Sequence, residues 1–177
     1  MSENKNNMVN SAMNYAIPLG IFWIFKYIFF MLGDYSALSL YIYNFLTVGT
    51  LVVYYFLISR YRDKDLGGEI EYGHVILFSL LLFLFASVLE IAVVALHIFV
   101  LKPEFLDEFK EQLITVAERF SVLLGDSYVE SIKMFASNMG GYYIFSYLLN
   151  NIFTGLFLSL IIGYFVSKKK TNYQKYN

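Results

Sequence analysis

The chain has 177 residues, of which 58% are hydrophobic, 20% are aromatic and 15% are charged. Because soluble domains carry about 25% charged residues, this composition argues against a soluble domain and favours lipid as the surrounding medium. The net charge of −1 provides no footprint for nucleic acid, and the absence of cysteine excludes disulfides, thiolate metal sites and cysteine nucleophiles.

Apolar segments long enough to cross a bilayer alternate with polar ones along the chain. Residues 1–14 are polar, and we expect them to form a frayed tail. The predicted membrane spans cover residues 15–32, 38–58, 75–101 and 142–166. In the first span, Pro18 falls in the first turn, where its missing N–H costs little. The third span is the most apolar, and as a helix it would reach about 40 Å across a hydrocarbon core of about 30 Å.

The segment between the third and fourth spans predicts two amphipathic helices, over residues 103–124 and 127–138. Apolar side chains recur every three or four residues in the first of them, and acidic side chains lie largely on its opposite face. The sequence therefore predicts an all-α fold in a single membrane domain. The predicted fold is a four-transmembrane-helix bundle with an extracytoplasmic amphipathic helical hairpin between spans three and four.

The basic residues predict the orientation of the bundle. The N-terminal tail, the loop at residues 59–74 and the C-terminal tail hold eight of the thirteen lysines and arginines. Those eight are Lys5, Arg60, Arg62, Lys64, Lys168, Lys169, Lys170 and Lys175. Since short cytoplasmic loops carry the excess of basic residues, we expect both termini and the 59–74 loop to be cytoplasmic.

Glu90 lies near the middle of the third span, where an ionisable side chain is costly and marks a functional site by default. Lys26 lies at a similar depth in the first span and is its predicted partner; Ser87 and His97 share the helical face of Glu90. One interpretation is a proton- or ion-linked polar track. The other is a structural ion pair, or a glutamic acid kept neutral by burial. We favour the structural interpretation, because no chain of acids crosses the membrane, and we expect His97 to be an ordinary interfacial residue.

Small and polar residues recur every four positions along the fourth span. They are Asn151, Gly155, Ser159, Gly163 and Ser167. Small residues on one stripe allow helix backbones to approach closely, and an asparagine can hydrogen-bond across the contact. The stripe therefore predicts a helix-packing face, used either within the bundle or between protomers.

The 59–74 loop is the most distinctive string of the sequence. It contains Arg62-Asp63, Gly67-Gly68 and Tyr72-Gly73. Its Gly-Gly lacks the spacing of a phosphate-binding loop, and two histidines without cysteine do not make a structural zinc site. We find no catalytic motif and predict no metal ion, no cofactor and no small-molecule substrate.

The same loop, as Arg62-Asp63…Gly67-Gly68-x-Ile70-x-Tyr72-Gly73, resembles the DUF4199 family (domain of unknown function 4199), small integral membrane proteins of Bacteroidota. The resemblance extends to residues 14–20 at the first span and to residues 102–106 before the amphipathic helices. It implies a bacterial inner (cytoplasmic) membrane, near cell-envelope machinery, and it transfers no catalytic residue.

Two functions remain as hypotheses. The first is a non-enzymatic inner-membrane subunit or assembly scaffold, which packs through its fourth span and presents the acidic helical hairpin to a partner. That partner would be a membrane or periplasmic protein, or a second copy of the chain. The alternative is a small ion- or proton-linked transport component that uses Glu90 with Lys26.

Overall fold

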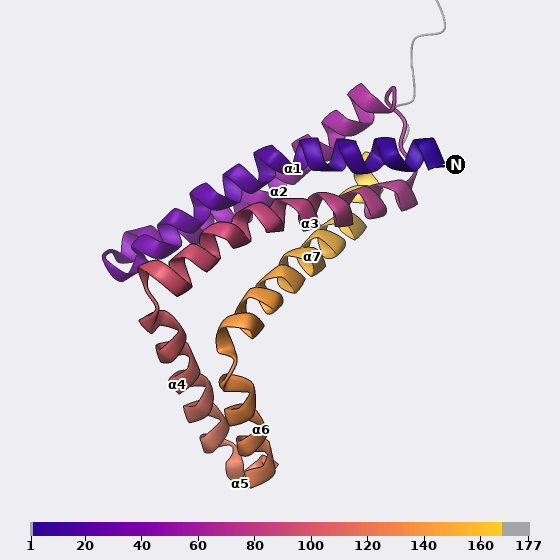
Figure 1. Cartoon of the computed structure of the whole chain (residues 1–177). Helices are drawn as coiled ribbons and strands as arrows, with labels where there is room; N and C mark the ends of the chain where they lie inside the picture. The colour runs from indigo at the N-terminus through magenta and orange to yellow at the C-terminus, as the bar shows by residue number, and fades with distance from the viewer. Residues whose placement is uncertain (1, 168–177) are drawn as a thin grey trace, which may run out of the picture. The chain divides into compact units, whose positions relative to one another are not determined.

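The computed structural model describes residues 2–167, and side chains from residue 7 onward. It has two compact units, one formed by the residues up to Glu90 with those from Asn150 onward, the other by Ile91–Leu149. The elements in chain order are α1 (Ser2–Met31), η1 (Leu32–Asp34), α2 (Ala37–Asp65), α3 (Tyr72–Leu96), η2 (His97–Leu101), α4 (Glu104–Arg119), α5 (Ser121–Leu124), α6 (Asp126–Ala136) and α7 (Met139–Val166) (Figure 1). In the described part of the chain, four helical segments are long and apolar enough to span a membrane, which confirms the predicted all-α membrane fold. The lysines at positions 168, 169, 170 and 175, and the side chain of Lys5, lie outside the described residues.

The first helix begins much earlier than predicted. We expected a frayed tail over residues 1–14, but α1 begins at Ser2. Met8 and Ala12 are buried there and continue the apolar stripe of Ala16 and Leu19. Polar residues separate these apolar positions in the sequence, and the stripe was therefore not recognised there. As a consequence, Pro18 lies in the interior of the helix, where its missing N–H removes one hydrogen bond to the preceding turn.

The predicted loop at residues 59–74 is also mostly helical. The second helix continues to Asp65 and α3 begins at Tyr72, so only residues 66–71 connect them. The extra turns of α2 are held by packing, because Ile58 and Tyr61 are buried. The ring of Tyr61 stacks on that of Phe78 with centroids 3.7 Å apart. Aromatic packing has therefore extended the helix through a charged stretch.

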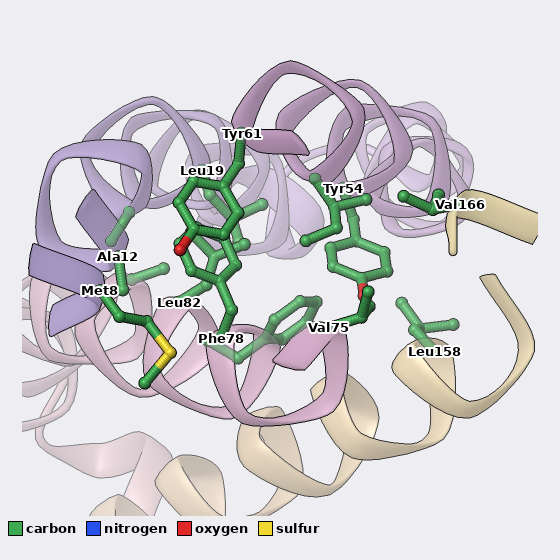
Figure 2. Packing of buried hydrophobic residues seen from close by; sticks show 14 of the residues in the cluster. Met8, Ala12, Leu19, Tyr54, Tyr61, Val75, Phe78, Leu82, Leu158 and Val166 are labelled. Atoms are coloured by element: carbon green, nitrogen blue, oxygen red, sulfur yellow. The ribbon is translucent and has the colours of Figure 1, made fainter. Parts of the chain in front are cut away.

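The core of the first unit lies where α1, α2, α3 and α7 meet. Figure 2 shows Tyr61 against Phe78, with Met8 on one side of this pair and Tyr54 near Val75 on the other. Leu158 and Val166 of α7 border the same core. Outward-facing side chains of these helices are apolar and exposed, for example Phe45, Phe56 and Phe153, as expected for helices surrounded by lipid.

The second unit contains η2, the helices α4, α5 and α6, and the beginning of α7. The predicted helix over residues 103–124 is broken near Phe120, so that α5 forms a separate turn. Gly125 follows α5 with a positive φ of 82°, a conformation that glycine adopts at no steric cost. Within this unit, Lys133 of α6 lies 3.6 Å from Glu118 of α4.

Candidate functional site

A polar cluster joins the four long helices of the first unit. Glu90 of α3 is fully buried, and its Oε1 lies 3.5 Å from the Nζ of Lys26 on α1. Its Oε2 accepts a hydrogen bond of 2.9 Å from the Nδ2 of Asn151 on α7. The structure thus brings together Lys26 and Glu90, which the sequence paired by depth, with Asn151, which the sequence placed on the packing stripe.

Two aromatic rings complete the surroundings of Lys26. Its Nζ lies 5.5 Å from the ring centroid of Trp23 on α1 and 5.6 Å from that of Tyr43 on α2. Such distances allow cation–π attraction, which strengthens where water is excluded. We call Trp23, Lys26, Tyr43, Glu90 and Asn151 the intramembrane cluster. Because its members come from all four helices, it fixes the depth at which each helix meets the others.

Two further residues that we associated with Glu90 have other roles in the structure. The hydroxyl of Ser87 donates to the carbonyl of Phe83 at 2.6 Å, which satisfies a buried hydroxyl within its own helix. We expected the ring of His97 to reach water, as in an ordinary interfacial residue, but this side chain is only 4% exposed. It belongs to the second unit, where its ring lies 5.7 Å from that of Phe105.

The stripe of small residues on α7 packs against α3 of the same chain. A Cβ added at Gly155 would collide with the ring of Phe83, and one added at Gly163 would lie 3.0 Å from Val75. Ser159 is fully buried on the same stripe. Of the two uses predicted for this face, the structure therefore displays packing within the bundle.

The distinctive residues at the end of α2 and in the α2–α3 connection hold helix ends together. Arg62 donates from its guanidinium to the carbonyl of Val166 at 3.0 Å, and also to Asp63 at 2.8 Å. The N–H of Gly68 donates to the carbonyl of Arg62 at 2.9 Å. Both Gly67 and Gly68 have positive φ, of 70° and 97°, which explains the Gly-Gly pair.

The other distinctive residues of the 59–74 segment, Tyr72 and Gly73, lie in the first turn of α3. The hydroxyl of Tyr72 donates to the carbonyl of Leu160 at 3.0 Å. Gly73 lies in the first turn of α3, with open space around the position of a Cβ. The string therefore specifies how α2, α3 and α7 end against one another.

Several buried polar contacts escaped the sequence interpretation. The hydroxyl groups of Tyr54 and Ser79 lie 2.6 Å apart, and the indole of Trp23 donates to Thr50 at 3.3 Å. Trp23 precedes Lys26 by three residues, so the two share a helix face. This spacing was the signal in the sequence that could have placed Trp23 beside Lys26. Among the described residues, no three His, Cys, Asp or Glu side chains are placed to hold a metal ion.

Comparison with known protein families gives a match over most of the chain. The family model described as "Protein of unknown function (DUF4199)" matches residues 14–168. No curated protein and no solved structure gives a significant match to the chain.

Proposed function

Because the chain belongs to the DUF4199 family, whose description assigns no activity, we propose a function from its own residues. We infer that the protein is a non-enzymatic subunit or assembly scaffold of a bacterial inner membrane, as expected for a protein of Bacteroidota. Its termini are cytoplasmic, and the helices α4, α5 and α6 are presented on the periplasmic side to a protein partner.

The observation that carries this proposal is an exposed apolar tip on the second unit. We define the apolar tip as Phe120, Val122, Leu123 and Leu124, which are 48%, 94%, 78% and 52% exposed. Clustered apolar side chains of this kind mark interaction sites when they are not lipid-facing. The helix beside the tip is acidic, and helices that bind anionic headgroups are usually basic on their polar face. A protein partner with an apolar groove and basic side chains around it fits both properties.

Charge distribution supports the orientation. The basic residues concentrate in the two tails and in the last turns of α2, whereas residues 102–141 carry four basic residues against seven acidic ones. Basic residues are retained on the cytoplasmic side, which leaves α4, α5 and α6 outside.

The contacts of Glu90 favour the structural role of the intramembrane cluster over ion-linked transport. Each carboxylate oxygen has a partner in the chain, Lys26 for one and Asn151 for the other. A carrier would have to break these contacts in each cycle. Carriers built from internal repeats also have more spans than the four described here.

The proposal is tested by photo-crosslinking in native membranes, with the photoreactive residue placed at Val122. The matched control places it at Phe153, which is also apolar and 63% exposed but lies on α7. We expect one discrete adduct with a second protein from Val122 and none from Phe153. Neutralising the acidic face with Glu108→Gln and Glu111→Gln should weaken that adduct.

Two results would overturn the proposal. One is the absence of any adduct from Val122 while the protein purifies alone as a monomer. The other is an adduct only with a second copy of the chain, which would make the apolar tip a self-association site.

A further inference from the structure

A pocket opens between α1 and α2 at the end of the first unit where the α2–α3 connection lies. It has a volume of about 480 Å³. Its lining comprises Asn14, Tyr15 and Pro18 of α1 with Leu57, Arg60, Lys64 and Asp65 of α2. No part of the proposed function above uses this pocket.

The two basic side chains of the pocket are available for a ligand. Arg60 and Lys64 are one turn apart on α2, so they lie on the same helix face, and both are exposed. Within the described part of the chain, neither forms an ion pair or a hydrogen bond with another residue. Arg62 differs from them, because its guanidinium is bonded to Val166 and Asp63.

The carboxylate of the pocket is engaged on the opposite helix. Asp65 accepts hydrogen bonds from the hydroxyl of Tyr15 at 2.6 Å and from that of Ser11 at 3.4 Å. These contacts hold α1 against α2 and form one wall of the pocket. The lining residues carry two positive charges and one negative charge, so a net positive charge faces a ligand.

The length of α2 predicts that the pocket lies where hydrocarbon gives way to headgroups. Leu57 is about 30 Å along the axis of α2 from Ala37 at 1.5 Å per residue, which is the thickness of a hydrocarbon core of about 30 Å. Arg60 and Lys64 follow in the next two turns. Ile21, one turn from Pro18 on α1, and Phe56, one turn from Arg60 on α2, are exposed apolar side chains.

We propose that this pocket binds the phosphate of a membrane phospholipid headgroup. Arg60 and Lys64 contact the phosphate oxygens, and Pro18 and Leu57 contact the adjoining apolar carbons of the lipid. Soluble phosphate esters carry the same phosphate chemistry. The apolar side chains of Pro18 and Leu57 in the lining, and the depth of the pocket, favour the lipid.

The test measures lipid retention by the purified full-length protein in detergent, with native mass spectrometry. The probes are phosphatidylglycerol, a diacylglycerol with the same acyl chains, and glycerol phosphate. We expect the protein to retain phosphatidylglycerol and neither of the others. In the Arg60→Gln, Lys64→Gln double variant, affinity should fall about thirtyfold, from the attraction of two basic side chains to an anionic headgroup.

Two control variants separate a site from general charge effects. Lys110→Gln with Arg119→Gln removes the same charge from α4 and should leave retention within about twofold of the original protein. Arg60→Lys with Lys64→Arg keeps both charges and should retain most of the binding. Because Arg60 and Lys64 are exposed, we expect the melting temperature to be unchanged in both of their double variants.

Three outcomes would overturn the inference. Equal retention of the diacylglycerol would exclude phosphate recognition, and equal affinity for glycerol phosphate would exclude a lipid site. An equal loss of retention in the α4 control would exclude this pocket. These outcomes are independent of whether the apolar tip binds a partner.

Discussion

The intramembrane cluster makes a quantitative prediction about stability. Lys26→Met removes the cation beside Glu90 but keeps an unbranched side chain of similar length against Trp23 and Tyr43. Methionine makes favourable contacts with aromatic rings, so packing should survive. The change therefore isolates the effect of leaving the carboxylate without its cation.

The expected loss follows from the distance between the charged atoms. Unit charges 3.5 Å apart attract by about 5 kcal/mol at an effective dielectric constant near 20. Removing one partner of a buried pair typically costs about 3–5 kcal/mol. We therefore expect Lys26→Met to lower the free energy of unfolding by about 3–5 kcal/mol. Combining it with Glu90→Gln should restore most of this loss, since replacing both members of a buried pair is often neutral.

The assay is reversible unfolding in mixed detergent micelles, analysed as a double-mutant cycle. Lys110→Met is the matched control, because Lys110 forms no ion pair with any described residue, and it should change stability by less than about 0.5 kcal/mol. A Lys26→Met loss below about 1 kcal/mol, or a double variant as unstable as the two single losses combined, would refute the reasoning. Variants that keep full stability but lose a cellular phenotype would instead favour the ion-linked alternative.

Two further predictions concern helix packing and orientation. Gly155→Ala places a methyl group against Phe83 and should destabilise the protein by about 1–3 kcal/mol in the same unfolding assay. The control is Gly73→Ala, which should be close to neutral because a Cβ at position 73 meets open space. The chain has no cysteine, so single cysteines can report its orientation. A cysteine that replaces Asp34 should react with an impermeant thiol reagent added outside intact cells, whereas one that replaces Leu66 should not. The reverse pattern would show that the proposed orientation is inverted.

The spans were predictable because a bilayer demands long uninterrupted apolar helices, and composition alone reveals these. The ends of the helices were not. The prediction stopped the second span at residue 58 because charge begins there, yet α2 continues to Asp65. The ring of Tyr61 stacking on Phe78 is a contact between positions distant in sequence, which no local pattern displays.

The site was predictable in part for a similar reason. Equal depth in two spans was enough to pair Lys26 with Glu90. Nothing local indicated that Asn151 would donate to that carboxylate, because its spacing to Gly155 already had an explanation as a packing stripe. Tyr43 was grouped with no site, since its approach to Lys26 depends on how α2 is rotated against α1.

The cluster and the stripe together explain how this bundle specifies one arrangement in lipid. Apolar faces give little preference between helices there, because lipid tails are as apolar as the side chains. Gly155 and Gly163 set how closely α7 approaches α3, but a row of small residues every four positions fits equally well after sliding by one turn. The hydrogen bond from Asn151 to Glu90 is lost on such a slide, and so it selects a single register. The buried charges therefore serve the specificity of the fold, and the exposed residues of the apolar tip and of the α1–α2 pocket are the surfaces that we propose for interactions with other molecules.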